Sequence, residues 1–208
     1  MKKIKLFDPV IGISEEREII KILRSGFWAS GSGSGKVQEF EKKFSKYLNS
    51  DQCVAVNSGT AALNLALSLL DIKNKEVILP SLSFVATAHA VTLNGGKPVF
   101  ADVDSETLCI DPKQIMKLIT KKTAAILPVH FAGIACNLNE ISQICQENNI
   151  KLIEDAAHAA GTKYDGRKIG SHSMAVCFSF HPVKNLGMPT GGLISINHVN
   201  HRKLKKIL

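Results

Sequence analysis

The pattern of hydrophobic and polar residues predicts that short buried strands alternate with helices over most of the chain. Seven short apolar runs, bounded by turn residues, follow one another from residue 52 onward: QCVAV, EVILP, KPVFADV, TAAILPV, KLIED, MAVCFSF and GGLISIN. Between them lie segments with helical spacing, whose starts are expected near Ser58, Phe84, Asp111 and Asn137. This alternation favours an α/β fold of three layers, with helices on both faces of a mainly parallel sheet of about seven strands.

The N-terminal part of the chain has a different pattern. Ser14 stands before two glutamates and an apolar-periodic stretch that Gly26 closes, so we expect a helix with Ser14 as its N-cap. The segment SGFWASGSGSGK follows, and we interpret it as a flexible loop, because no strand precedes it and its GK pair lacks the spacing of a phosphate loop.

A second helix is expected after this loop. Val37, Phe40, Phe44 and Leu48 recur at helical spacing, which is typical of a helix that faces a core. We therefore divide the chain into an N-terminal helix and loop, residues 1–35, and a larger domain, residues 36–208. The final stretch, HVNHRKLKKIL, is expected to open another helix.

Composition and charge narrow the class of protein. The chain has 208 residues and a formal net charge of +8, but its lysines lie in polar helical stretches without interleaved aromatic residues, so we expect no nucleic-acid partner. The five cysteines are scattered singly, which indicates buried free thiols and no metal site. The apolar runs are shorter than the roughly 20 residues that cross a bilayer, and MKKIKLFDPV lacks the apolar core of a signal peptide. A cytoplasmic protein without a membrane segment is expected.

Candidate chemistry gathers where the predicted strands end. Ligands of open α/β sheets bind beyond the carboxyl ends of the strands. In NSGTAAL, the first strand is followed by Ser58, Gly59 and Thr60 at a helix start. Free backbone N–H groups and hydroxyls at such a start suit a phosphate. Taken alone, the motif indicates an ordinary serine N-cap equally well. Asp155 ends the fifth strand as a carboxylate that needs a cationic partner.

The stretch SFHPVKN completes the set. Ser179 and Lys184 leave the sixth strand at the same edge, and the bend at Pro182 constrains where the lysine amine points. A lysine in desolvating surroundings loses its proton more easily and becomes a nucleophile toward aldehydes. A phosphate site, a buried carboxylate and a constrained lysine are together the groups that hold pyridoxal phosphate.

These motifs resemble a known family. NSGTAAL, PSLSFVAT, GGKPVFADVD, PVHFAG, EDAAHAAGTKYDGRKIGS and SFHPVKN, in this order, are similar to the DegT/DnrJ/EryC1/StrS family of pyridoxal-phosphate enzymes, the nucleotide-sugar aminotransferases of fold type I. The resemblance runs from about Ile4 to the end of the chain. It implies that the larger domain is the cofactor-binding large domain of this fold, and that the chain acts as a homodimer.

The resemblance also implies roles for single residues. Lys184 would form the Schiff base with the cofactor and then move protons as general acid and base, while Asp155 would keep the pyridine nitrogen protonated. The other expected cofactor contacts are the phosphate ligands Gly59, Thr60 and Ser179 with Ser58 as a further candidate, Phe84 stacked on the ring, and His158 on its hydroxyl side. His130 and His181 are expected either near the substrate or in structural hydrogen bonds.

The implied reaction moves an amino group from an amino acid such as glutamate, by way of pyridoxamine phosphate, to a keto-sugar carried on a nucleotide diphosphate. The net positive charge would help to attract such an anion. Relatives with His in place of this lysine are sugar dehydratases, and Lys184 favours transamination instead.

The chain also departs from the family pattern. Residues 188–192 read MPTGG where many relatives have Gly-Glu-Gly-Gly, so the local turn is expected to differ. Family members are much longer, so the C-terminal small domain is expected to be absent. A truncated homologue that binds cofactor or dimerises without catalysis therefore stays open beside the transaminase and dehydratase readings.

Overall fold

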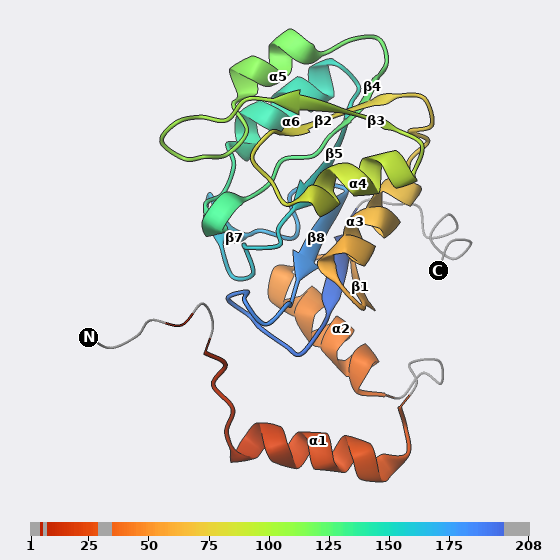
Figure 1. Cartoon of the computed structure of the whole chain (residues 1–208), viewed down its shortest axis with the longest axis vertical. Coiled ribbons are helices and arrows are strands. Elements are labelled where there is room, and N and C mark those ends of the chain that lie inside the picture. Colours follow the sequence, from red (N-terminus) through yellow and green to blue (C-terminus); the bar gives the residue numbers. More distant parts are fainter. Residues whose placement is uncertain (1–4, 6–7, 29–34, 198–208) are drawn as a thin grey trace.

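A seven-stranded sheet lies at the centre of the part of the chain that the structure describes. This computed structural model describes Lys5, residues 8–28 and residues 35–197 (Figure 1). The strand order is β1-β9-β8-β5-β4-β2-β3, and β9 runs antiparallel to its neighbours β1 and β8 while the other pairings are parallel. The strands are β1 Gln52–Val56, β2 Glu76–Pro80, β3 Lys97–Ala101, β4 Thr123–Ile126, β5 Lys151–Asp155, β8 Ala175–Ser179 and β9 Gly192–Ile196. The predicted α/β class and mainly parallel sheet are confirmed.

The four helices between the strands of the sheet, α3 to α6, begin where their capping residues predict. The described elements outside the sheet are α1 Ile13–Ser25, α2 Lys36–Leu48, α3 Gly59–Ser68, α4 Val85–Leu93, α5 Pro112–Leu118, α6 Leu138–Glu147, the short 3₁₀ turn η2 Phe131–Gly133, and a hairpin of β6 Lys163–Tyr164 and β7 Arg167–Lys168. Ser58, Asp111 and Asn137 each accept a backbone N–H from the first turn of α3, α5 and α6. Phe84 is the N-cap of α4 without a side-chain bond, so all four expected helix starts are confirmed.

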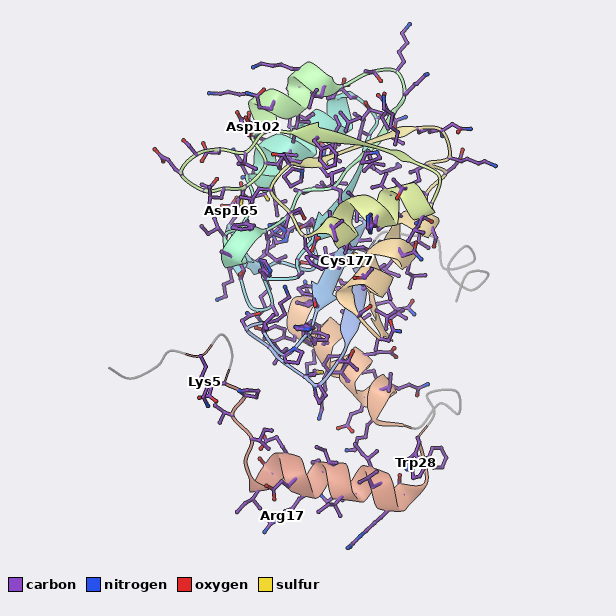
Figure 2. All side chains as sticks on the ribbon, viewed as in Figure 1. Lys5, Arg17, Trp28, Asp102, Asp165 and Cys177 are labelled. Atoms are coloured by element: carbon purple, nitrogen blue, oxygen red, sulfur yellow. The ribbon has the colours of Figure 1, made fainter. Side chains whose placement is uncertain are left out.

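The start of α1 differs from the prediction. Gly12 is the N-cap, and the Glu15 carboxylate accepts the Gly12 N–H at 2.8 Å, so Ser14 lies inside the first turn. A carboxylate three residues into a helix can reach back to the cap N–H, which a serine one residue earlier cannot do. Helix α1 has no buried residue and lies apart from the sheet (Figure 1), and the side chains of Arg17 and Trp28 extend from this part of the chain into solvent (Figure 2).

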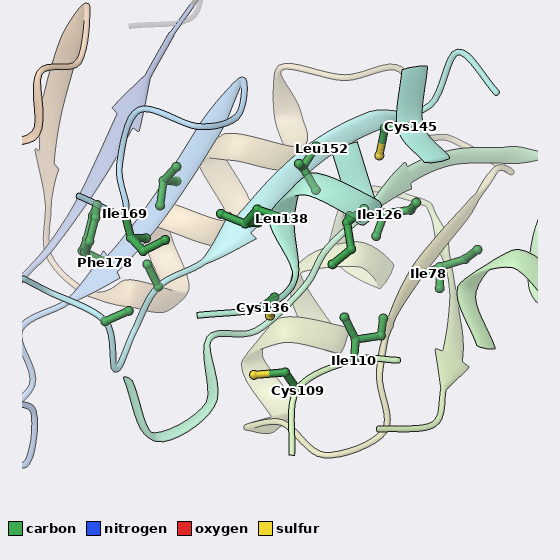
Figure 3. Close-up of a cluster of buried hydrophobic side chains, with 14 of the residues drawn as sticks. Ile78, Cys109, Ile110, Ile126, Cys136, Leu138, Cys145, Leu152, Ile169 and Phe178 are labelled. Atoms are coloured by element: carbon green, nitrogen blue, oxygen red, sulfur yellow. The ribbon is translucent and has the colours of Figure 1, made fainter. Parts of the chain in front are cut away.

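Two hydrophobic cores lie on the two faces of the sheet, which gives the predicted three layers. Side chains alternate along each strand, so Ile78 packs on the face covered by α2, α5 and α6, while Val77 and Leu79 pack on the face covered by α3 and α4. Figure 3 shows the first core, with Ile110, Leu138 and Phe178 among its members. In α2, Phe44 and Leu48 are buried as expected, but Val37 is exposed.

Three further expectations have different outcomes. All five cysteines are free and buried, as predicted. The helix expected over residues 198–208, and the central residues 29–34 of the glycine- and serine-rich segment, lie outside the described residues. Across the described ranges, every helix is too short or too polar to span a bilayer.

Candidate active site

A cavity of about 410 Å³ opens at the edge of the sheet where the parallel strands end. Loops that follow β1, β2, β4, β5 and β8 form its wall, which is the position that an open α/β sheet uses for ligands. The predicted site residues that line it are Ser58, Gly59, Thr60, Phe84, Asp155, His158, Ser179, His181 and Lys184. The structure thus brings together nine of the ten side chains or backbone positions that the sequence indicates, and His130 is the exception.

One end of the cavity is built from the start of α3. The Ser58 hydroxyl accepts the Ala61 N–H at 3.1 Å, so Ser58 has the N-cap role that was the alternative reading of this motif. The N–H groups of Gly59 and Thr60, at the first two positions of α3, have no intrahelical acceptor and can bind an anion. Gly59 packs so closely on Ser179 that a Cβ atom at position 59 would lie 2.7 Å from the Ser179 Cβ atom. Glycine is therefore a steric requirement at this position.

The MPTGG segment holds the same helix end in place. A Cβ atom on Gly192 would lie 2.3 Å from the backbone carbon of Ser58, and the Thr190 hydroxyl donates to the Asn57 carbonyl at 2.9 Å. Sequence reasoning noted this segment only as a departure from the family pattern. The paired glycines before an apolar strand were the signal that two backbones approach closely there.

Asp155 places a carboxylate at the floor of the cavity. It is only 4% exposed, its Oδ1 atom accepts the Ala157 N–H at 3.1 Å, and its Oδ2 atom accepts the Thr87 hydroxyl at 2.9 Å. Burial raises the pKa of Asp155, and these two hydrogen bonds oppose that shift. A buried carboxylate of this kind is stabilised by a cation in the adjoining cavity.

Lys184 lies on the loop after β8 and lines the same cavity as Asp155. The turn that presents it is closed by a hydrogen bond from the Lys184 N–H to the His181 carbonyl at 2.8 Å. Burial lowers the pKa of Lys184, and the negative charge of Asp155 opposes this shift. The amine is therefore more readily deprotonated than a surface lysine, as a nucleophile toward an aldehyde requires.

His158 and Phe84 both line the cavity. The His158 Nδ1 atom accepts the Ala132 N–H at 3.2 Å, so the neutral ring carries its proton on Nε2. Burial, followed by the nearby charge of Lys184, lowers the pKa of His158 and favours this neutral form. Phe84 is 75% exposed although it lines the cavity, so its ring has an uncovered face that a flat ligand could cover.

The two remaining histidines differ from each other. His130 is fully buried and lies outside the cavity lining; its Nε2 atom is 2.8 Å from the Glu154 carboxylate, and its Nδ1 atom accepts the Cys136 N–H at 3.1 Å. His130 is therefore held in structural hydrogen bonds, which is the second of the two roles that the sequence left open for it. His181 does line the cavity and is exposed, with its Nδ1 atom accepting the Val183 N–H at 3.4 Å.

Sequence reasoning missed a pair of hydrogen-bonded hydroxyl side chains in the site. Ser83 lines the cavity, and its hydroxyl oxygen is 2.6 Å from that of Thr87, which lines the cavity as well and donates to Asp155. Both residues belong to the PSLSFVAT motif and are four positions apart, which places them on one side of the start of α4. That spacing could have indicated them.

The residues present fit pyridoxal phosphate. The start of α3 offers free N–H groups with no side chain at position 59 to block them, Asp155 offers a buried anion, and Lys184 offers an amine of lowered pKa. An anion site, a carboxylate and a lysine in one cavity match the phosphate, ring nitrogen and aldehyde of this cofactor.

Comparisons with known proteins agree with this fit. The model of the DegT/DnrJ/EryC1/StrS aminotransferase family matches residues 9–208. The spore coat polysaccharide biosynthesis protein SpsC of Bacillus subtilis (strain 168) is 43% identical over 188 residues, which are 90% of this chain and 48% of SpsC.

Two solved structures are similar over almost the whole chain. Spr1654 from Streptococcus pneumoniae, solved in its PLP-form and its PMP-form, has a TM-score of 0.92 at 31% identity over 98% of this chain and 56% of its own. DesI, solved in the presence of its TDP-sugar product, has a TM-score of 0.82 at 33% identity over 92% of this chain and 48% of its own. The chain thus spans about half the length of the proteins it matches. By the match over residues 9–208, the chain belongs to the DegT/DnrJ/EryC1/StrS aminotransferase family.

Proposed function

We propose that this chain is the cofactor-binding domain of a pyridoxal-phosphate aminotransferase that acts on nucleotide-linked keto-sugars. The observation that carries the proposal is that Lys184 and Asp155 line one cavity together with the start of α3. The family match and the PLP-form and PMP-form of Spr1654 support the cofactor, and the TDP-sugar product of DesI supports the substrate class. Glutamate is proposed as the amino donor.

Each group of the chain has a defined task in this reaction. The first-turn N–H groups of α3 and the Ser179 hydroxyl would bind the phosphate, and Asp155 would hold a proton at the ring nitrogen. When bound, pyridoxal phosphate supplies an aldehyde and an electron-withdrawing ring. Lys184 is the side chain whose amine would bind the aldehyde and, once displaced by the amino donor, carry a proton between neighbouring atoms of the substrate.

The cofactor part of the proposal is tested by covalent trapping. The purified chain is incubated with pyridoxal phosphate, reduced with borohydride, digested and mapped by mass spectrometry. We expect a yellow complex before reduction and a pyridoxyl group on Lys184 afterwards. Lys184→Ala is expected to lose the label, while Lys163→Ala, which alters an exposed lysine of the β6-β7 hairpin, keeps it. Labelling of other lysines without Lys184 would refute the proposal.

The reaction type is tested by a half-reaction. Addition of glutamate to the loaded chain should yield pyridoxamine phosphate and 2-oxoglutarate, both of which are measured by chromatography. A chain that is labelled at Lys184 but gives neither product would be a binding protein, which is the alternative of a catalytically incomplete homologue. Release of ammonia with a deoxysugar product would instead identify a sugar dehydratase.

The proposed assembly is a homodimer. Leu82, Phe84 and Val85 are apolar and close in sequence, with exposed fractions of 37%, 75% and 53%, and Phe84 also lines the cavity. Neighbouring exposed apolar side chains of this kind mark interaction surfaces. Light scattering after size-exclusion chromatography tests the assembly, and we expect a mass of twice the 22.6 kDa chain. A mass of one chain at micromolar concentration would contradict it.

A further inference from the structure

The Asp155 carboxylate is held on both of its oxygen atoms. Oδ1 accepts a backbone N–H from the next turn of its own loop, at Ala157, whereas Oδ2 accepts the hydroxyl of Thr87, which comes from α4 and is 68 positions away in sequence. Thr87 is fully buried and is the third residue of α4. A threonine in a helix can satisfy its hydroxyl by bonding a carbonyl three or four residues earlier. Thr87 instead donates to a carboxylate on the neighbouring strand β5.

The direction of this hydrogen-bonded chain follows from the protons available. An ionised carboxylate carries no proton, so Thr87 must be the donor in its 2.9 Å bond to Asp155. A hydroxyl has a single proton, so in the 2.6 Å contact between Ser83 and Thr87 the proton must come from Ser83. Both hydroxyl dipoles therefore point toward Asp155, and each bond strengthens the next.

This arrangement opposes the effect of burial on Asp155. Burial is the main cause that raises the pKa of this carboxyl, and the Thr87 bond is among the contacts that lower it. The other titratable side chains that act on Asp155 from packed elements are His130 and His158, and Lys184 lines the same cavity. Among the contacts of Asp155, the Thr87 bond can be removed without changing a charge.

We propose that Thr87, supported by Ser83, is a positioning residue that holds the Asp155 carboxylate as an oriented anion for the ring nitrogen of the cofactor. The proposal rests on the proposed function for the identity of the ligand. Thr87 acts through Asp155. Hydrogen bonds to both Asp155 oxygen atoms fix the plane of the carboxylate, and the remaining lone pairs can accept a proton donor in the cavity. A purely structural threonine would fill the same volume without affecting the charge state of Asp155 or of the ligand.

The test uses pyridoxamine phosphate, which cannot condense with Lys184, so its affinity reports the phosphate and ring-nitrogen contacts alone. Thr87→Val keeps the shape and removes the hydroxyl, whereas Thr87→Ser keeps the hydroxyl. Thr92→Val makes the same change on the same helix at an exposed residue, whose hydroxyl donates to the His89 carbonyl. Dissociation constants are measured by fluorescence from acid to neutral pH. The ring-nitrogen protonation of the bound ligand is measured by ¹⁵N NMR.

We expect Thr87→Val to weaken binding about tenfold at neutral pH, equivalent to about 1.4 kcal/mol, and to shift the ¹⁵N signal toward the unprotonated ring. The acid limb of the binding curve should move to higher pH, because loss of the donor raises the pKa of Asp155. Thr87→Ser should stay within about threefold of the unaltered chain, and Thr92→Val should match it, since neither loses a hydrogen bond to a charged group.

A second variant and a ligand-free measurement keep the test decisive if Thr87→Val folds poorly. Ser83→Ala, at the cavity wall, should change binding and the ¹⁵N signal in the same direction by a smaller factor, about threefold. A ¹³C NMR titration of the ligand-free chain should show a higher pKa of Asp155 in either variant than in the unaltered chain.

The outcomes separate the two proposals. An unaltered chain that binds neither pyridoxamine phosphate nor pyridoxal phosphate refutes the proposed function and, with it, the role of Thr87 toward a cofactor. If the unaltered chain binds pyridoxamine phosphate, and Thr87→Val or Ser83→Ala binds it equally well with the same pKa of Asp155, only the positioning role is refuted. The same holds if Thr87→Ser is as impaired as Thr87→Val, because the volume and not the hydroxyl would then matter.

Discussion

Replacing Gly192 of β9 with alanine should displace the start of α3, because the two backbones are in close contact. The added Cβ atom would lie 2.3 Å from both the carbonyl carbon and oxygen of Ser58 and 2.7 Å from the Gly59 nitrogen. Ordinary contacts of a Cβ atom begin near 3.4 Å. The two backbones must therefore separate by about 1 Å, and no flexible side chain can move aside in their place.

The expected magnitude follows from two opposing effects. Overpacking in a closely packed region costs about 1–3 kcal/mol, and a backbone collision belongs at the upper end of this range. Alanine regains about 0.5–1 kcal/mol over glycine inside a strand, because glycine loses more conformational freedom on folding. The free energy of unfolding should fall by about 2 kcal/mol, which lowers the melting temperature by about 4–8 °C for a chain of this size.

The assay combines stability with ligand binding. Urea and thermal unfolding are followed by circular dichroism, and the dissociation constant of pyridoxamine phosphate is measured by fluorescence. We expect binding to weaken about tenfold, since a 1 Å displacement of the Ser58 and Gly59 backbone loses a hydrogen bond to a charged phosphate, worth about 1.5 kcal/mol. The control is Gly35→Ala, where the added Cβ atom has no neighbour within 4 Å. It should cost at most about 1 kcal/mol and leave binding unchanged.

The reasoning would be refuted by a Gly192→Ala chain that unfolds at the same urea concentration as the unaltered chain and binds pyridoxamine phosphate equally well. Such a result would mean that α3 can move relative to β9 without cost, so the close approach at residues 58 and 192 would not hold the anion site.

Three further predictions concern other buried groups. In Asp155→Asn, the cofactor-free chain should be more stable than the unaltered chain at pH 7, and the gain should vanish in acid. The folded-state pKa of Asp155 is raised, so the stability that Asp155 contributes is present below its ordinary pKa and is lost as pH rises through the raised value. Equal urea midpoints at pH 7 would contradict this. His130→Leu should lower the free energy of unfolding in urea by about 3–5 kcal/mol, because it leaves Glu154 buried without a partner. The double variant His130→Leu, Glu154→Leu should recover most of this loss. A double variant no more stable than the single one would show that packing matters more than the ion pair. Ala132→Gly should raise the unfolding free energy by up to about 1 kcal/mol, because residue 132 has φ of 51°, which glycine adopts without strain; a lower melting temperature would argue against strain.

Local sequence patterns were sufficient for the seven strands of the sheet and for the starts of α3 to α6. Apolar runs of strand length and capping residues such as Asp111 act within a few positions, so they identify strands and helix starts without knowledge of the rest of the chain. The error at Ser14 shows the limit of such patterns: the helix begins two residues earlier, at the Gly12 cap, and Ser14 donates its hydroxyl to the Glu15 carboxylate that accepts the Gly12 N–H.

The candidate site was also largely predictable, because the carboxyl ends of parallel strands meet at one edge whatever the details of packing. Asp155 and Lys184 could be placed together for that reason. His130 could not be placed in this way. It follows the same strand as Phe131, which lines the cavity, yet His130 is fully buried and pairs with Glu154, whose side chain faces away from that of Asp155 along β5.

By itself, the amino-acid sequence determined the order of the elements, the edge of the sheet that carries the chemistry, and the lysine, carboxylate and helix start that form the site. Tertiary structure alone decided which atoms meet across that edge: Thr87 with Asp155, Gly192 with Ser58, and His130 with Glu154. These contacts join residues far apart in sequence, and differences of a few tenths of an ångström decide whether they form. Periodicity and capping act over single turns and strands, and therefore carry no information at that precision.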